Sequence, residues 1–133
     1  MTHDGVAAWL ERYVEAWKSY DRDQIGDLFS EDVVCRYRPF DKPFVGRKAV
    51  VDSWLGEAEQ EGAPGLDEPG TFEAEYGPVA VDGQTAVAVG RSSYRDEPGG
   101  EIKRVYFNCF VMRFDDEGRC SEFTEWFMLE QDA

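Results

Sequence analysis

The first third of the chain has an apolar pattern with the period of an α-helix. From Val6 onward, apolar side chains recur at i, i+3, i+4 and i+7 while charged side chains occupy the opposite face, which predicts a first helix. Asp21, with Gln24 three residues later, is a capping-box-like start and predicts a short second helix. The apolar residues expected on this second helix are Ile25, Leu28 and Phe29.

The segments that follow change character several times. Residues 33–37 are predicted to form a short strand, and two prolines make residues 38–43 irregular. Residues 57–70 combine two prolines, three glycines and a cluster of acids, a composition that cannot bury a face. This segment is expected to be a mobile loop, and a lid over a pocket is one role for it. A third helix is expected between these segments, after Gly46, with an apolar stripe of Val50, Trp54, Leu55 and Ala58.

The second half of the chain is typical of β-strands. Strands are expected at residues 72–81 and 84–95, joined by an Asp-Gly turn that is a strong short hairpin signal. Two longer apolar runs, at residues 104–114 and 119–129, are joined by an acidic turn and predict a second hairpin.

This order of elements predicts the fold class. Helices followed by a long antiparallel meander indicate an α+β fold, with N-terminal helices packed on one face of a strongly curved, mainly antiparallel sheet. The chain has 133 residues, which is the usual size of one domain, so residues 1–133 are expected to form a single domain.

The second hairpin allows its pairing to be predicted. If residues 115–118 form the loop, Asn108 lies opposite Glu125, and the adjacent strand places Ala88 beside Asn108. In the same register, Phe110 lies opposite Phe123, Tyr106 lies opposite Phe127 and Gly90 lies beside Tyr106.

One face of this sheet is expected to enclose a cavity. The face of strand 84–95 that adjoins Asn108 and Glu125 carries only small residues, which leave volume unfilled as a ligand cavity requires. The alternative is that Trp17 and Trp54, from the predicted helices, fill this volume. The small residues are Ala86, Ala88, Gly90 and Ser92.

The opposite face of the predicted sheet is apolar as well. A sheet that is apolar on both sides needs cover on both sides, and the predicted helices are too few to supply it. We therefore expect a homodimer that pairs through this outer face. The residues expected at the interface are Val87, Val89, Phe107, Val111 and Trp126.

Composition narrows the classes of partner. The chain has 28 acidic against 14 basic residues, a formal net charge of −14, which argues against nucleic acid and against an anionic membrane as a partner. An N-terminal leader with a charged and then an apolar part is not evident, and no apolar run approaches the length of a membrane span. The expected location is the cytoplasm.

The three cysteines give no sign of a metal or redox site. Cys35, Cys109 and Cys120 are odd in number and each falls in a predicted strand, which is typical of a cytosolic protein. With the single His3 they supply neither a conventional zinc site nor a Cys/His nucleophile pair. A structural role is expected for all three, and no metal site is expected.

Two strings in the first half resemble a known superfamily. The string RYVEAWKSYDRDQIGDLFSEDV is similar to the first two helices and first-strand entry of the nuclear transport factor 2-like (NTF2-like) superfamily, and PFVGRKAVVDSW is similar to the start of its third helix. This superfamily contains ketosteroid isomerases, scytalone dehydratase and SnoaL-type polyketide cyclases. The resemblance covers essentially the whole chain and implies a cone-shaped α+β fold, which hosts many activities and also proteins that only bind.

The resemblance carries over only part of the isomerase site. Tyr13 falls where ketosteroid isomerases keep the tyrosine that donates to the oxyanion. The isomerase base falls on Tyr37 or Arg38, and the second oxyanion acid falls on Phe110. Two of the three isomerase groups are therefore missing, so the resemblance does not imply steroid isomerisation. The dehydratase pattern needs histidines in the cavity, and His3 is poorly placed for that role.

The candidate site combines one carboxylate with two donors. Glu125 is the one carboxylate predicted on the pocket face of the last strand, where desolvation would raise its pKa and make it a general acid or base. Tyr13 and Asn108 are expected to act as hydrogen-bond donors. The residues expected to line the pocket are Trp17, Tyr37, Arg38, Trp54, Tyr106, Phe110, Met112 and Phe127.

These residues are consistent with two functions. The first is a SnoaL-like pocket protein that acts on a small hydrophobic molecule as an acid/base enzyme of the cyclase, isomerase or hydrolase type, with no metal or organic cofactor. The second is a non-catalytic dimeric module that binds a hydrophobic ligand or a protein partner. In the second function Glu125 is only a structural partner of Asn108, Arg36 or Arg38.

Overall fold

The described part of the chain folds into three helices packed against one curved sheet. The computed structural model describes residues 1–130. The helices are α1 (His3–Ser19), α2 (Arg22–Asp27) and α3 (Arg47–Trp54). The strands are β1 (Phe29–Arg36), β2 (Phe44–Val45), β3 (Phe72–Asp82), β4 (Thr85–Arg95), β5 (Ile102–Phe114) and β6 (Cys120–Leu129).

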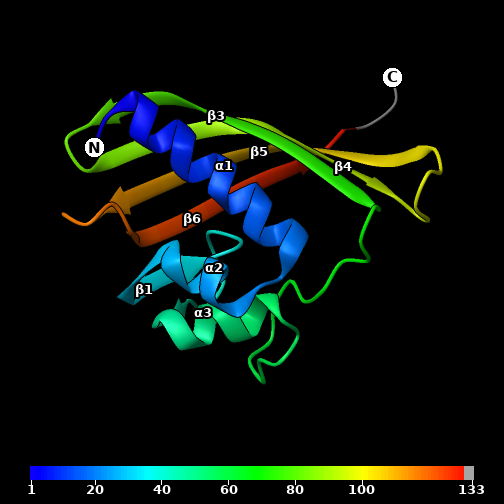
Figure 1. The fold of residues 1–133 in the computed structure, drawn as a ribbon, viewed down its shortest axis with the longest axis horizontal. Coiled ribbons are helices and arrows are strands. Elements are labelled where there is room, and N and C mark those ends of the chain that lie inside the picture. The colour runs from blue at the N-terminus through cyan, green and yellow to red at the C-terminus, as the bar shows by residue number, and fades with distance from the viewer. Residues whose placement is uncertain (131–133) are drawn as a thin grey trace.

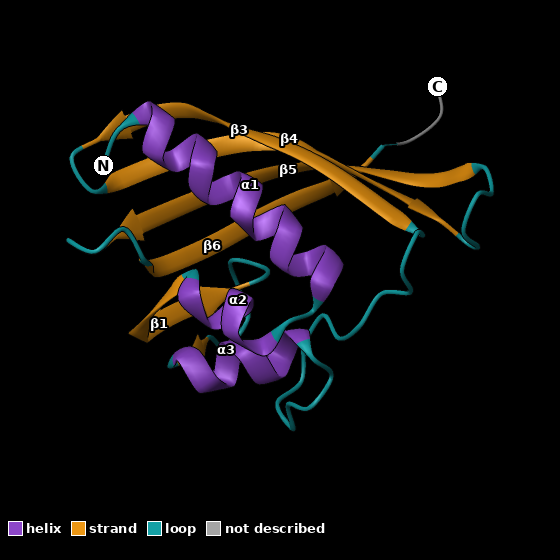
Figure 2. Cartoon of the chain, viewed as in Figure 1, coloured by secondary structure: helices purple, strands orange, loops and turns teal. Residues whose placement is uncertain are grey.

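The strands form one mixed sheet in the order β2-β1-β6-β5-β4-β3. β1 runs parallel to β6, and the other neighbouring strands are antiparallel. Figures 1 and 2 show α1 lying across the long strands, with α2 and α3 beside β1 at the other end of the sheet. The predicted α+β fold with helices on a mainly antiparallel sheet is confirmed. Among the described residues, no helix combines the length and the apolar character needed to cross a membrane.

Helix α1 is held by its caps and by one buried hydrogen bond. The Thr2 side chain accepts from the Gly5 N–H at 3.0 Å, and the left-handed Tyr20 ends the helix with its own N–H bonded to the Ala16 carbonyl. Trp9, which is fully buried, donates from Nε1 to the Leu28 carbonyl at 2.9 Å. This bond fixes α1 against the segment that joins α2 to β1, and Tyr13 one turn later is buried on the same face.

The boundaries near α2 and α3 differ from those predicted. Asp21 caps α2 as expected, accepting from the Gln24 N–H at 3.0 Å, but the helix ends at Asp27. Phe29 was expected on this helix and instead begins β1, because it pairs with Cys120 of β6. α3 likewise ends at Trp54, so the predicted helical positions Leu55 and Ala58 lie beyond it.

The predicted strand pairings are wrong by two residues. Asn108 pairs with Phe127, and Phe110 pairs with Glu125, because Arg119 joins the turn and a bulge lies between the Phe114 and Arg113 pairs. The Asp115 carboxylate widens this turn by accepting the backbone N–H groups of Glu117 and Arg119.

A similar bulge between Tyr94 and Arg95 shifts the β4–β5 pairs, so that Ala88 lies beside Phe110 and Gly90 beside Asn108. Side chains alternate with a period of two, so a shift of two residues leaves every side chain on its predicted face.

Strands β3 and β4 approach each other closely at Gly90, on the part of the sheet beside α1. A Cβ atom at Gly90 would lie 2.0 Å from the Glu75 carbonyl oxygen and 2.6 Å from Cδ1 of Tyr76. Only glycine fits here, and the Tyr76 ring therefore folds over the backbone of Gly90 toward α1. Tyr76 reaches the core, where its ring centroid lies 6.1 Å from that of Tyr13.

Candidate functional site

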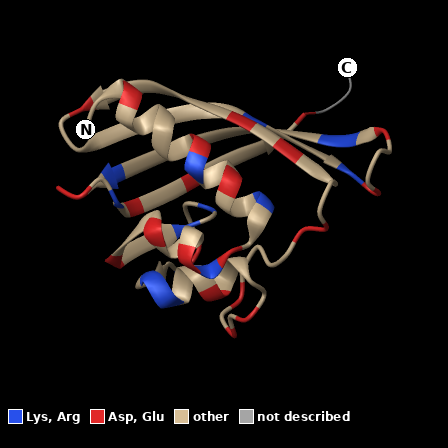
Figure 3. Cartoon of the chain, in the orientation of Figure 1, with Lys and Arg blue, Asp and Glu red and all other residues tan. Residues whose placement is uncertain are grey.

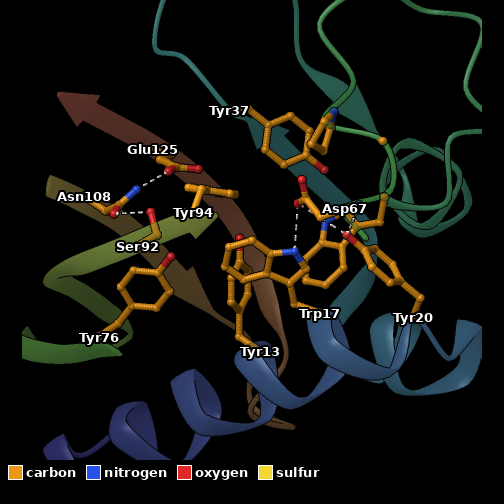
Figure 4. Close-up of a pocket in the computed structure, with 13 residues that line it drawn as sticks. Tyr13, Trp17, Tyr20, Tyr37, Asp67, Tyr76, Ser92, Tyr94, Asn108 and Glu125 are labelled. Carbon is orange, nitrogen blue, oxygen red and sulfur yellow. Dashed lines mark hydrogen bonds between the residues drawn. The ribbon is translucent and has the colours of Figure 1, made fainter. Parts of the chain in front are cut away.

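A small chamber lies between α1, the sheet, α3 and the segment that follows α3 (Figure 4). Its cavity volume is about 100 Å³. An outer vestibule of about 450 Å³ shares part of its wall, including Tyr94, Asn108 and Glu125. The chamber is lined by Tyr13, Trp17, Tyr20, Tyr37, Trp54, Pro64, Gly65, Asp67, Tyr76, Ser92, Tyr94, Asn108 and Glu125.

A hydrogen-bonded row on three neighbouring strands forms one wall of the chamber. Ser92 of β4 donates to Oδ1 of Asn108 at 3.0 Å, and Asn108 of β5 donates from Nδ2 to Oε2 of Glu125 at 2.8 Å. Ser92 and Asn108 are buried. The serine hydroxyl thus fixes the asparagine amide with its N–H side toward the carboxylate. The predicted contact between Asn108 and Glu125 is made, although the two residues are diagonal rather than directly opposite on the strands.

Burial changes the acidity of Glu125. Desolvation raises the pKa of its carboxyl from 4.5 to about 7, and the hydrogen bond from Asn108 acts in the opposite direction. Near neutral pH, Glu125 therefore exists in both its protonated and its ionised form. A carboxyl with this property can take a proton from a ligand or give one to it.

Three tyrosines surround this carboxyl from three different elements. Burial raises the pKa of Tyr13 in α1, of Tyr76 in β3 and of Tyr94 in β4, and the negative charge of Glu125 adds to each shift. These hydroxyls consequently stay protonated and can donate hydrogen bonds at neutral pH. The Tyr13 hydroxyl makes no hydrogen bond to the described part of the chain, so it is free to serve a ligand.

The opposite wall carries a second carboxylate, that of Asp67. Trp17 donates from Nε1 to Oδ2 of Asp67 at 3.1 Å. The Tyr20 hydroxyl accepts the Asp67 N–H at 2.8 Å and donates to Oδ2 at 3.5 Å. Residues 56–70 are thereby fastened to α1 and to the residue that ends it, and Pro64, Gly65 and Asp67 close one side of the chamber.

The remaining wall is built from α3 and from the end of β1. The Tyr37 hydroxyl donates to Oγ of Ser53 at 2.6 Å, and Ser53 in turn donates to the Val50 carbonyl at 2.6 Å. The Tyr37 hydroxyl is therefore already used within the protein. Trp54 meets Tyr13 edge to face, with their ring centroids 5.0 Å apart, and this packing sets the position of the Tyr13 ring.

The structure divides the predicted lining residues into three groups. Trp17, Tyr37 and Trp54 line the chamber. Arg38, Tyr106 and Phe127 line the vestibule, together with Arg104.

Phe110 and Met112 do not line either space. Each is 1% exposed and lies in the hydrophobic core, because aromatic rings cover this part of the sheet. The Tyr76 ring centroid lies 4.8 Å from that of Phe110, and the Phe123 centroid lies 5.1 Å from it. The small residues Ala86 and Ala88 also face this core, so the volume beside them is filled, and the cavity lies further along β4 at Ser92.

Sequence reasoning missed Tyr20, Asp67, Tyr76 and Tyr94. Tyr94 lies on the same face of β4 as Ser92 and Gly90, because the three residues are spaced two apart. This spacing could have placed Tyr94 in the pocket. Asp67 carries no such signal, because its position depends on the path of an irregular segment.

The described residues contain no group of three or more His, Cys, Asp or Glu side chains that could hold a metal ion. Burial raises the pKa of the Cys35 thiol to about 12 and that of Cys120 well above its ordinary value. The thiolate is the reactive form of cysteine, so neither residue is a nucleophile at neutral pH.

Comparison with known proteins gives the fold a family. The model of the SnoaL-like domain matches residues 10–123. No curated protein sequence matches the chain. An NTF2-like protein of unknown function from Burkholderia xenovorans LB400 has a similar crystal structure, with a TM-score of 0.67 and 19% identity over 98% of this chain and 88% of that chain.

Two further structures are similar over most of their length. Bal32a, from a soil-derived mobile gene cassette, has a TM-score of 0.62 and 22% identity over 94% of this chain and 90% of its own. An NTF2-like protein of unknown function from Mesorhizobium loti has a TM-score of 0.61 and 23% identity over 95% of this chain and 93% of that chain. These likenesses are of fold, and the match to residues 10–123 shows that the chain belongs to the SnoaL-like domain family of the NTF2-like superfamily.

Proposed function

We propose that this protein binds a small hydrophobic molecule in the chamber and vestibule and moves protons on it without a metal or organic cofactor. The observation that carries the proposal is Glu125, a carboxyl with a pKa raised to about 7 on the wall of an aromatic cavity. The reaction would be of the cyclase, isomerase or hydrolase type, in which one group takes a proton and returns it elsewhere.

The residues around Glu125 support three roles. Asn108 holds Oε2 of the carboxylate at 2.8 Å, which leaves Oε1 to face a substrate and accept its proton. Tyr13 has a hydroxyl that can donate to an oxygen on which negative charge develops, the kind of stabilisation that contributes most in a site without water. Trp17 and Trp54 supply aromatic surface for the part of the substrate that lies in the chamber.

The proposal is tested by the exchange of carbon-bound hydrogen. Small enolisable ketones with aromatic substituents are incubated in heavy water, and deuterium uptake next to the carbonyl is followed by NMR. Wild-type protein should accelerate uptake, and Glu125→Gln should lower the rate by at least about a hundredfold, the usual contribution of a positioned acid or base.

Glu122→Gln is the matched control, because Glu122 is an exposed residue on the same strand. Uptake that is equal in wild type, Glu125→Gln and Glu122→Gln would refute the catalytic role. A direct companion measurement is the carboxyl ¹³C titration of Glu125, which should have its midpoint near 7, and a midpoint near the ordinary 4.5 would count against the role as well.

The second candidate is a dimeric module that only binds, and one observation favours dimerisation. The face of the sheet turned away from α1 carries exposed apolar side chains, among them Val89 and Phe107, each 46% exposed, and Trp126, 44% exposed. Val87 and Val111 lie on the same face of β4 and β5. We propose that two chains pair through this face, which would cover a patch that monomers rarely leave open.

Sedimentation at micromolar concentration tests this pairing. The wild-type protein should sediment as a dimer, and Phe107→Glu together with Val89→Glu should give monomer. A wild-type mass of 15.2 kDa would rule the dimer out. The cytoplasm stays the proposed location, since Cys35, Cys109 and Cys120 are all free thiols.

A further inference from the structure

The inner chamber has an unusual combination of lining groups. Its wall contains seven aromatic side chains and two carboxylates, and it contains no Lys, Arg or His side chain. Figure 4 shows Glu125 and Asp67 on opposite sides of the space between the rings. The vestibule differs, because Arg38 and Arg104 lie in its wall.

Neither carboxylate has a cation to balance it within the described chain. The donors that reach Glu125 and Asp67 are neutral: the amide of Asn108, the indole of Trp17 and the hydroxyl of Tyr20. Neither acid takes part in an ion pair within residues 1–130. A carboxylate that faces a small cavity without a cation makes the space favourable for a positive charge.

The aromatic rings favour the same kind of ligand. The faces of Trp and Tyr rings carry partial negative charge, and rings arranged around a space are the usual way in which proteins recognise organic ammonium groups. Trp17, Trp54 and Tyr13 approach the chamber from two helices, and Tyr76 and Tyr94 approach it from the sheet. Rings on several sides of a space that also contains two acids suit an organic cation better than an uncharged apolar group.

We propose that the substrate of this site is an organic amine, whose protonated or alkylated ammonium group lies in the chamber between Glu125 and Asp67 while its uncharged remainder lies in the vestibule. This inference rests on the proposed function and specifies the class of molecule on which the site acts. The chamber of about 100 Å³ fits a compact head group, and the vestibule of about 450 Å³ has room for the rest.

The arginines of the vestibule do not oppose this arrangement. Arg38 is bonded to Asp41 at 2.9 Å and lies over the Phe40 ring, and Arg104 lies over the ring of Tyr94, 5.0 Å from its centroid. Both are exposed to solvent, which screens their charge. Figure 3 shows acidic residues distributed over helices, strands and loops, and the net charge of −14 attracts cations to the molecule as a whole.

A matched pair of probes tests the charge requirement. Choline and 3,3-dimethylbutan-1-ol have the same shape and differ by a quaternary nitrogen in place of a carbon. Calorimetry and the fluorescence of Trp17 and Trp54 should show choline binding at least about tenfold more tightly, as expected for a desolvated cation among aromatic rings. Equal binding of the two probes, or no binding of either, would overturn the inference.

Proton release gives an independent readout. A cation beside Glu125 favours its ionised form, so choline should lower the pKa of Glu125 and release protons at pH 7. Calorimetry in two buffers with different ionisation enthalpies measures this release. The alcohol should release none, and choline binding without proton release would contradict the placement of the ammonium group beside Glu125.

Variants separate the two carboxylates from the general charge of the protein. Asp67→Asn and Glu125→Gln should each weaken choline binding about five- to tenfold and leave alcohol binding within about twofold, because only the charge changes. Glu11→Gln, on the exposed side of α1, removes the same charge elsewhere and should change neither. Choline binding unchanged in both pocket variants would overturn the inference.

Failure of this inference and failure of the proposed function have different signatures. If Glu125 titrates near 7 in the free protein and ketone exchange depends on it, but choline binds no better than the alcohol, the amine is wrong and the acid/base role stands. If choline binds selectively while Glu125 titrates near 4.5, the site recognises cations and does not transfer protons.

Discussion

The two carboxylates of the chamber are held in opposite ways. Glu125 stands on β6 beside Asn108 and Ser92, so its position is set by three paired strands. Asp67 stands on an irregular segment and is held by side chains of α1 and Tyr20. The pKa of Glu125 is raised by its burial on this wall, and Asp67 fastens residues 56–70 to α1 and Tyr20 on the other side of the same space. The difference is that the position of Glu125 is set by strand pairing, whereas that of Asp67 is set by a few side-chain hydrogen bonds to an irregular segment, which should open more readily.

The largest effect is expected from breaking the strand wall at Gly90. In Gly90→Ala, the added Cβ would lie 2.0 Å from the Glu75 carbonyl oxygen, so β3 and β4 must separate. We expect a loss of about 3 kcal/mol in the free energy of unfolding, at the upper end of the range typical of overpacked sites. Urea denaturation measures this loss.

Gly77→Ala is the matched control for Gly90→Ala, because a Cβ there meets nothing within 4 Å. It should change stability by less than about 1 kcal/mol. Similar stabilities for the two variants would show that β3 and β4 are not in close contact at Gly90.

The next effect concerns the dependence of stability on pH. The pKa of Glu125 rises from 4.5 to about 7 on folding, so between these values the unfolded chain releases a proton that the folded chain keeps. The stabilisation is fully present below pH 4.5 and is lost as the pH rises through 7, with a magnitude on the order of 3 kcal/mol. Glu125→Gln should remove this loss and be the more stable protein at pH 8.

Thermal unfolding of both proteins between pH 4 and 8 checks this. The two curves should converge at low pH, where Glu125 is protonated and resembles glutamine. Parallel curves over the whole range would mean that the carboxyl keeps its ordinary pKa in the folded state.

A weaker effect on stability is expected from loosening residues 56–70, which close one side of the chamber. Tyr20→Phe removes the hydroxyl that accepts the Asp67 N–H and donates to its carboxylate. We expect a loss of about 1 kcal/mol, the usual net contribution of such a bond, and faster hydrogen exchange confined to residues 56–70. Tyr106→Phe, which removes a hydroxyl from the vestibule, should leave exchange in this segment unchanged.

The smallest effect is expected at Asn108. Its hydrogen bond favours the ionised form of Glu125, so Asn108→Leu should raise the pKa of Glu125 above that of the wild type. The ¹³C titration of the Glu125 carboxyl measures the change. Ser92→Ala leaves the amide in place and should cause a smaller shift in the same direction. A fall in the pKa of Glu125 in either variant would contradict the arrangement in which Ser92 donates to Asn108 and Asn108 donates to Glu125.

The sequence predicts the sheet faces better than the strand pairs. Asn108 and Glu125 were expected directly opposite each other and are instead diagonal, because a turn took in Arg119 and a bulge followed. Both changes together moved the register by two residues, so the two side chains remained on one face and still met. The face on which each side chain of a strand lies follows from the sequence, because side chains alternate along the strand. The length of the turn instead depends on contacts of the folded chain, such as those of the Asp115 carboxylate.

The position of Asp67 on the opposite wall of the chamber could not be predicted from the sequence, for a physical reason. Residues 57–70 have no period, so nothing local indicates which of their acids turns inward. Asp67 turns inward because the Trp17 indole of α1 donates to its carboxylate and the Tyr20 hydroxyl, at the end of α1, accepts its backbone N–H. These contacts exist only in the folded chain. Phe110 was misplaced for a related reason: its face was predicted correctly, but the ring of Tyr76 that covers it comes from a separate strand.

The closeness of β3 to β4 at Gly90 also limits how this pocket could change over generations. Every side chain larger than hydrogen is excluded at position 90, so this position of the wall beside Tyr76 should stay glycine. Residues 56–70 are constrained mainly at their glycines, since Gly56, Gly62, Gly65 and Gly70 all have positive φ, and other positions in the segment are open, such as Leu66, which is 61% exposed. Selection for a new ligand, in nature or in a mutant library, should therefore accumulate its accepted substitutions at the non-glycine positions of that segment, while the strands keep the acid and its partners unchanged.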